Sequence, residues 1–199
     1  MKTHSSKIVI RPIETRREWR NLIRLYRGAF PRAERKPVII LMSAWRKRKA
    51  DVWYAEKVLP CGKTRFLGFA ITLNGKKAVM LDYLAVSPKE RGNGSGTAFI
   101  KTLLNTYAPS GFFVEIESIY EENASNLVQR EKRRLFYIRN GFQPLRVTAD
   151  VFGVQMELLG VNMKIDFQAY NAFYRENYSP FAAKFVRPLP PPKSFRSEA

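Results

Sequence analysis

Residues 81–96 read LDYLAVSPKERGNGSG, and this segment decides the fold. An apolar run with strand character meets a turn, then a basic, glycine-rich hexapeptide, then a helical pattern that begins at Thr97. Three glycines at alternate positions leave backbone N–H groups open to an approaching anion. The helix that follows points its positive dipole end at the same place. The segment therefore predicts a cradle for a pyrophosphate group.

Two other phosphate-binding motifs do not fit this segment. A Walker A loop is excluded because no Gly-Lys-Ser/Thr closes the turn. A dinucleotide fingerprint needs G-x-G-x-x-G, whereas Gly92, Gly94 and Gly96 are spaced G-x-G-x-G. That fingerprint also needs a βαβ unit with a later acidic residue, and none is evident.

The hexapeptide Arg91-Gly92-Asn93-Gly94-Ser95-Gly96 resembles the acetyl-coenzyme A signature of the GNAT superfamily of N-acetyltransferases, R/Q-x-x-G-x-G/A. It matches this signature at every fixed position. The later segment LFYIRNGF, residues 135–142, is similar to a second family signature, in which an aromatic pair ends a helix and Gly-Phe opens a strand. Asn140-Gly141 is a suitable helix stop. The two signatures occur in the family's order, and the resemblance covers about residues 65–160.

The resemblance implies a mixed α/β class, the GNAT acyl-CoA N-acyltransferase fold. We expect a central, mostly antiparallel, twisted sheet of about six to seven strands flanked by helices. Residues 1–186 are predicted to form a single domain, with a C-terminal aromatic helix at about 163–178. The proline-rich basic tail, residues 187–199, is predicted to be disordered.

Periodicity and turn signals give the expected elements. Thr15 and Glu18 have the spacing of a capping box at the start of the first helix. Asn74-Gly75 predicts a hairpin turn. Strands are expected at 7–13, 51–58, 65–73, 77–86, 112–118, 142–149 and 151–159, with a turn at 149–150. Helices are expected at about 15–30, 38–49, 94–108 and 121–140.

The resemblance also implies site residues for acetyl transfer, in which a thioester is held, an amine loses a proton and a thiolate leaves. Arg91, Gly92, Asn93, Gly94, Ser95 and Gly96 would hold the pyrophosphate. The backbone of Leu84, Ala85 and Val86 would line the pantetheine arm. Tyr137 would donate its phenolic proton to the leaving sulfur.

The general base is left open among three carboxylates. Glu115 and Glu117 fall on one face of the strand that faces the acceptor in related enzymes. The alternative is that they form a solvent-exposed pair that balances the basic surface. Asp82, on the strand before the cradle, ranks third. Arg130 stands where many relatives carry an asparagine, and it is a candidate ligand for a cofactor phosphate.

Length and composition limit the number of cores, the kinds of metal site and disulfide, and the compartment. The chain has 199 residues, which suits one core. A single cysteine, Cys61, excludes an intramolecular disulfide and a cysteine-rich metal site, so no metal is expected. His4 is the only histidine, which argues against histidine acid–base chemistry. No apolar run is long enough to span a bilayer, and we expect a cytoplasmic protein without membrane contact.

The formal charge of +18 at pH 7 invites a nucleic-acid partner. The basic runs lack the aromatic interleaving of a single-strand binding groove, and most are expected to be solvated faces. The aromatic stripe Phe167, Tyr170, Phe173, Tyr174 and Tyr178 is expected in the core or in a homodimer contact.

The sequence therefore predicts an N-acetyltransferase that transfers an acetyl group from acetyl-CoA to a primary amine. A small-molecule acceptor is favoured over a protein because no peptide-docking insertion is evident. Two alternatives stay open. One is a non-catalytic acyl-CoA-binding sensor module, and the other is a basic acetyltransferase associated with nucleic acid or the ribosome.

Overall fold

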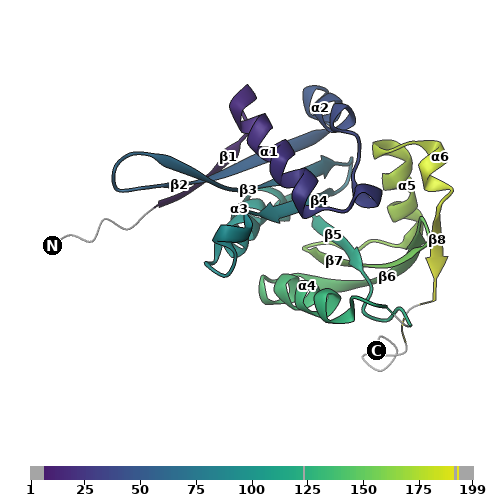
Figure 1. Cartoon of the computed structure of the whole chain (residues 1–199). Coiled ribbons are helices and arrows are strands. Elements are labelled where there is room, and N and C mark those ends of the chain that lie inside the picture. Colours follow the sequence, from purple (N-terminus) through teal and green to yellow (C-terminus); the bar gives the residue numbers. More distant parts are fainter. Residues whose placement is uncertain (1–6, 123, 191, 193–199) are drawn as a thin grey trace. The chain divides into compact units, whose positions relative to one another are not determined.

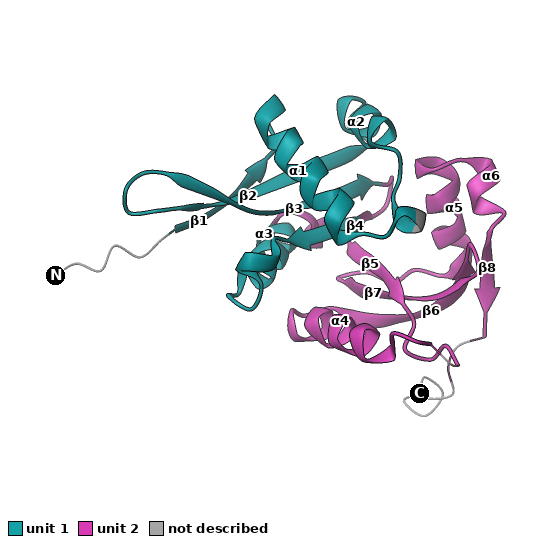
Figure 2. Ribbon diagram, in the orientation of Figure 1, with its two compact units in different colours: residues 1–74, 81–105 teal, residues 75–80, 106–199 magenta. Residues whose placement is uncertain are grey.

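The structure is a computed structural model that describes residues 7–122, 124–190 and 192. The chain divides into two compact units, which Figure 2 shows in two colours. Unit 1 comprises residues 1–74 and 81–105, and unit 2 comprises residues 75–80 and 106–199. The single domain expected for residues 1–186 stays a prediction.

Unit 1 combines antiparallel strands with three α-helices and two short 3-10 helices. Its strands follow the order β1-β2-β3-β4, and both β1 and β3 pair antiparallel with β2. In Figure 1, α1 and α2 lie above these strands and α3 lies below them. The strands are β1 (Lys7–Pro12), β2 (Ala50–Val58), β3 (Thr64–Asn74) and β4 (Val79–Val86), whose residues from 81 onward belong to unit 1. The helices are α1 (Arg16–Ala29), η1 (Arg32–Glu34), α2 (Val38–Arg46), η2 (Pro88–Glu90) and α3 (Ser95–Tyr107).

Helix α1 begins where the sequence predicts it. The Thr15 side chain accepts a hydrogen bond from the Glu18 backbone N–H, and the Glu18 carboxylate accepts one from the Thr15 N–H at 3.0 Å. This reciprocal pair satisfies two N–H groups that the helix cannot pair internally. Trp19, Leu22 and Tyr26 form the buried stripe that packs α1 into unit 1. The capping box is confirmed.

Unit 2 also layers helices on antiparallel strands. Its strands follow the order β5-β7-β6-β8, and each neighbouring pair is antiparallel. In Figure 1, α4 lies below these strands, and α5 and α6 lie above them. The strands are β5 (Phe112–Glu117), β6 (Gln143–Val151), β7 (Val154–Val161) and β8 (Val186–Leu189). The helices are η3 (Ala108–Ser110), α4 (Leu127–Arg139), α5 (Phe167–Asn177) and α6 (Pro180–Ala183).

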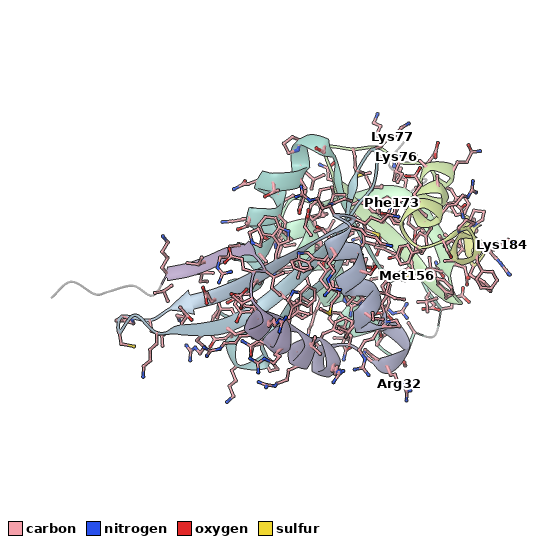
Figure 3. All side chains as sticks on the ribbon, turned by 90° about the horizontal axis from the view of Figure 1, so that it is seen from above. Arg32, Lys76, Lys77, Met156, Phe173 and Lys184 are labelled. Carbon is pink, nitrogen blue, oxygen red and sulfur yellow. The ribbon has the colours of Figure 1, made fainter. Side chains whose placement is uncertain are left out.

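The aromatic stripe of α5 contributes to the core of unit 2. Tyr170, Phe173 and Tyr174 are buried, and the Phe173 ring lies 5.2 Å from that of Phe113 on β5. Figure 3 labels Phe173 beside the turn that carries Lys76 and Lys77. A Cβ at Gly75 would come within 2.5 Å of the Phe173 ring, so this turn needs glycine for close packing. The core expectation for the stripe is confirmed at these three positions.

The mixed α/β class with mostly antiparallel strands is confirmed, but the chain has eight strands among its described residues instead of six to seven. The additional strand is β8, in which Arg187 pairs with Asp150 of β6. Residues 187–189 of the expected tail thus lie in a strand. Residues 191 and 193–199 of that tail are outside the described residues. Pro188 is tolerated because β8 is the last strand in the order of unit 2.

Two expected boundaries are wrong. The turn between β6 and β7 falls at Phe152-Gly153, where both residues have positive φ angles of 52° and 86°, rather than at 149–150. Paired positive φ values suit a tight hairpin, and the glycine supplies one of them at no steric cost. Helix α4 begins at Leu127 rather than near residue 121.

Candidate functional site

The glycine-rich turn in unit 1 has the conformation that an anion cradle requires. Gly92 and Gly94 have φ angles of +78° and +75°, which only glycine adopts readily. Apart from the glycine and its two chain neighbours, no described residue has an atom within 4 Å of a Cβ placed at either position, and residues 91–94 are exposed. The backbone of this turn is therefore open to a ligand.

Helix α3 starts directly after the turn. The carbonyl of Gly94 accepts the first intrahelical hydrogen bond, from the N–H of Ala98 at 2.9 Å. The N–H groups of the preceding residues, including Ser95 and Gly96, belong to the first turn and have no partner within the helix. Ser95 is buried at this end of the helix. The helix dipole and these N–H groups together favour a negatively charged ligand.

The cradle is braced by the strands before it. The Nε of Arg91 donates to the carbonyl of Val86 at 3.2 Å, and the N–H of Ser87 donates to the carbonyl of Leu67 at 2.7 Å. The buried carboxylate of Glu90 lies 3.1 Å from the Nε of Arg65. These contacts hold the turn against the ends of β3 and β4.

Strand β4 carries Leu84, Ala85 and Val86 up to the cradle. Gly68 on β3 faces this segment, and a side chain there would clash with the carbonyl oxygen of Ala85. A register shift between Ala55 and Glu56 on β2 lies opposite Gly68. The close backbone approach at Gly68 was not predicted, although an isolated glycine within a strand pattern is its usual signal.

Asp82 is held within an ion pair in unit 1. Its carboxylate accepts from the Nζ of Lys36, which also lies 5.3 Å from the centre of the Tyr83 ring. The Tyr83 hydroxyl donates to the carbonyl of Glu34 at 2.8 Å, and burial raises the pKa of that hydroxyl. The carboxylate therefore helps to fix the segment between α1 and α2.

Tyr137 lies on α4 in unit 2, and its side chain is buried. Its ring lies 5.2 Å from that of Phe136 and 5.3 Å from that of Phe142. Its hydroxyl makes no hydrogen bond with any residue that the structure describes. Burial raises the pKa of Tyr137 to about 12, although the charge of Arg133 opposes this change. The phenol is consequently protonated at neutral pH, as a proton donor must be.

Glu117 and Arg130 are brought together in unit 2. The Glu117 carboxylate lies 3.2 Å from Nη2 of Arg130 and 2.7 Å from Nη1 of Arg133, and it accepts from Nδ2 of Asn126 at 3.1 Å. Burial alone would raise its pKa. The hydrogen bond from Asn126 and the two guanidinium charges outweigh burial, so the pKa of Glu117 lies below its usual value.

The Arg130 guanidinium is itself buried and is bound by other residues of its own chain. Its Nε donates to Oδ1 of Asn126 at 2.6 Å, and its Nη1 donates to the carbonyl of Ser118 at 2.9 Å. The same Nη1 also pairs with Glu121. These contacts give Arg130 a structural task at the start of α4, and its binding of a cofactor phosphate stays a prediction.

Glu115 has different partners from Glu117, although both lie on β5. Its carboxylate accepts from the hydroxyls of Tyr170 and Tyr174, the latter at 2.8 Å. Burial raises the pKa of Tyr170 well above the usual value, so this hydroxyl keeps its proton. The two glutamates are thus bound to separate helices, α5 and α4, and neither is merely a solvated counter-charge.

One buried carboxylate was missed. Glu157 on β7 is 1% exposed and lies 3.1 Å from the Nε of Arg134, while its Oε1 has no partner among the described residues. Burial raises its pKa, and Arg134 only partly offsets this. The signal that could have indicated this buried carboxylate is a single glutamate within the apolar run at residues 156–159. A carboxylate with a raised pKa is a candidate for proton transfer.

The predicted residues therefore form local groups within each unit. In unit 1, residues 84–86 lead into the cradle at 91–96, and Asp82 is paired nearby on β4. In unit 2, Glu117 and Arg130 share one cluster, whereas Glu115 belongs to another. No helix in the described part of the chain is long and apolar enough to cross a membrane. The described residues contain no cluster of three or more His, Cys, Asp or Glu suited to a metal ion.

Comparison with solved structures identifies the fold. A protein from Bacteroides thetaiotaomicron assigned to the GNAT family of acetyltransferases superposes with a TM-score of 0.65 at 16% identity, covering 88% of this chain and 98% of that one. The chain has the GNAT fold. Spermidine N-acetyltransferase from Vibrio cholerae, solved with CoA and spermine, shares this GNAT fold with a TM-score of 0.59 and 12% identity over 77% of this chain and 94% of its own.

A third neighbour with the GNAT fold acts on a protein. The ribosomal-protein-alanine N-acetyltransferase from Escherichia coli has a TM-score of 0.55 and 15% identity, covering 80% of this chain and 96% of that one. No family model and no curated protein matches the sequence. At these identities the likeness establishes the fold, and it agrees with the fold resemblance predicted from the two signatures.

Proposed function

We propose that this protein is an acetyl-CoA-dependent N-acetyltransferase that acts on a primary amine. The observation that carries the proposal is the conformation of the cradle. Gly92 and Gly94 take positive φ angles with open space around them, directly before the N-terminus of α3. The signature residues thus have the backbone shape that a pyrophosphate site needs.

Acetyl-CoA would be held by the chain's own backbone groups. The N–H groups of residues 92–96 would bind the pyrophosphate, and Arg91 would add a positive charge beside it. The backbone of Leu84, Ala85 and Val86 would accept the pantetheine arm. When bound, acetyl-CoA supplies the activated acetyl group.

Tyr137 is the proposed proton donor to the departing thiolate. Its hydroxyl is protonated at neutral pH and has no hydrogen bond within the described chain, so donation breaks no existing contact. The proposed proton acceptor is Glu117 or Glu115, with Asp82 third. Glu157 joins them because its buried carboxylate has a raised pKa and one oxygen without a described partner.

A small-molecule amine is the proposed acceptor. The fold neighbour solved with spermine acts on a polyamine, which is a primary amine of this class. The neighbour that acts on a ribosomal protein represents the other acceptor class. Both classes belong in the first screen.

The test begins with calorimetric titration of the purified chain with acetyl-CoA at physiological salt. Saturable one-site binding in the micromolar range is expected, followed by CoA release with at least one amine from a panel of polyamines, aminoglycosides and peptide N-termini. Binding without turnover on any amine would favour an acyl-CoA sensor module instead. A folded protein that does not bind acetyl-CoA would overturn the proposal.

A further inference from the structure

The exposed face of α1 is a stripe of arginines. In the sequence these arginines occur as one adjacent pair and three isolated positions. Folding into a helix brings all of them to the same side. With about 100° of rotation per residue, all five fall within a sector of about 100°, and they extend over about 16 Å of the helix axis. The members of this arginine face are Arg16, Arg17, Arg20, Arg24 and Arg27, and all five are exposed.

The arginine face forms no ion pair with an acidic residue in the described part of the chain. None of its five guanidinium groups forms an ion pair within the described chain. The one acidic residue inside α1, Glu18, is buried and lies 2.6 Å from Arg11. Residues 14–49 contain twelve lysines and arginines against three glutamates. Five like charges on one helix face repel one another, so the arrangement costs stability unless an anion binds.

A second basic segment lies beside the same helix. Residues 46–49, Arg-Lys-Arg-Lys, are exposed at the end of α2. The preceding Trp45 packs against Trp19 of α1 with ring centres 5.3 Å apart, which brings this basic turn next to the N-terminal half of α1. Figure 1 shows α1 and α2 side by side on the same side of the unit 1 strands. The basic surface therefore continues from one helix to the next.

We propose that the arginine face of α1 binds the phosphate backbone of duplex DNA. Arginine is suited to phosphate because its guanidinium forms bidentate hydrogen bonds in a rigid fork. An α-helix fits the major groove of B-form DNA, whereas the major groove of A-form RNA is too narrow for it. Contacts to phosphate fix the position of a protein on the duplex without reading its bases, so we expect binding that is independent of base sequence.

This binding is separate from acetyl transfer and does not depend on it. The cradle is proposed to bind the two phosphates of a single pyrophosphate group, whereas the arginine face matches a linear polyanion. About five phosphate contacts predict a slope near −4.5 for log K against log salt. Affinity for DNA should therefore fall by about 500-fold between 50 and 200 mM salt.

The test measures binding of the full chain to a fluorescent 20-base-pair DNA duplex across that salt range. The variant R16Q/R20Q/R24Q/R27Q should make the slope less steep by about 3 to 4. It should also reduce the affinity for the duplex at low salt by about 10²-fold. The control K132Q/R139Q/K164Q/K184Q removes the same charge from exposed positions of unit 2. Lys184 points away from the ribbon in Figure 3. Circular dichroism shows whether both variants remain folded, and glutamine suits a helix nearly as well as arginine.

Retention of steep, salt-dependent binding in the control and its loss in the α1 variant would support the proposal. Equal losses in both variants would overturn it, because net charge alone would then explain binding. Failure of the unaltered chain to bind the duplex at 50 mM salt would overturn it as well. Tighter binding of the matching RNA duplex, or equally effective competition by polyglutamate of equal charge, would assign the face to a different partner.

Discussion

The Nη2 of Arg130 lies 3.2 Å from the Oε1 of Glu117. The sequence predicted separate tasks for these residues, a phosphate contact for one and proton transfer for the other, yet they form one ion pair. Because Arg133 and Asn126 also bind the carboxylate, Glu117 is kept ionised at neutral pH. This arrangement gives the pair a role in stability that can be measured apart from catalysis.

Replacing Glu117 with glutamine should destabilise the protein. The variant leaves the buried Arg130 and the neighbouring Arg133 without a shared carboxylate, at a cost of about 1–3 kcal/mol at pH 7. The folded-state pKa of Glu117 is lowered, so its contribution is present above the unfolded pKa and is lost as pH falls through the folded value. Urea unfolding at pH 7 and at successively lower pH checks this. A difference that persists undiminished under acid conditions would contradict the assignment.

The general base should be identified by comparing three glutamine variants. E117Q, E115Q and E157Q each remove one carboxylate from unit 2, and a direct base should lose about 10²-fold or more in kcat/KM. Activities must be corrected for the folded fraction, because each carboxylate also has hydrogen-bond or ion-pair partners. If all three variants keep activity, D82N is the next variant to test.

Tyr137→Phe should separate catalysis from cofactor binding. The hydroxyl has no hydrogen bond within the described chain, and the ring packs on Phe136 and Phe142, so phenylalanine should fit with little loss of stability. We expect kcat to fall by about 10²-fold or more while the Kd for acetyl-CoA stays the same. Steady-state kinetics and calorimetry provide the two readings. Unchanged kcat would remove Tyr137 from the mechanism.

Gly94→Ala should weaken acetyl-CoA binding more than it weakens the fold. The φ angle of +75° makes alanine strained by about 1 kcal/mol, and the added methyl group projects into open space at the cradle. Gly62 in the β2–β3 turn has the same φ angle and the same open surroundings, so Gly62→Ala is a matched control. Both variants should lose similar stability in thermal unfolding. Only G94A should raise the Kd for acetyl-CoA. A similar rise in G62A would contradict the proposal that the cradle binds acetyl-CoA.

Glu18→Gln should lower stability in a pH-dependent way. Burial raises the pKa of Glu18, but the hydrogen bonds from Arg11 and from the backbone of Glu14 and Thr15 lower it to about 2. Because the folded pKa is depressed, stability from the charged carboxylate is complete above about pH 4.5 and is lost as pH falls towards 2. We expect a loss of about 2 kcal/mol at pH 7, discounted for the partly exposed Arg11.

The control for this variant is Glu14→Gln. The Glu14 side chain is 67% exposed and lies 3.7 Å from Arg11, so its removal should change stability little. Chemical unfolding at pH 7, 4 and 3 compares the two variants. A pH-independent difference for E18Q would show that the carboxylate shape, rather than its charge, supports the cap.

The sequence by itself determined the features that are built from neighbouring residues. The cradle depends on six consecutive residues whose glycines supply the required φ angles, and the cap of α1 depends on Thr15 and Glu18 three positions apart. Tyr137 is placed by its distance from the helix stop at Asn140-Gly141. Such features were predictable because short-range sterics and hydrogen bonds decide them before any long-range packing occurs.

Only the tertiary structure decided the partners of the charged and phenolic groups. Glu115 binds Tyr170 across 55 positions of the chain, Asp82 binds Lys36 across 46, and Glu157 is buried against Arg134 across 23. A pattern along the chain gives the face of a strand, but it does not give the element that packs on that face. Burial and nearby charge set the pKa of each group, and both depend on contacts between distant segments.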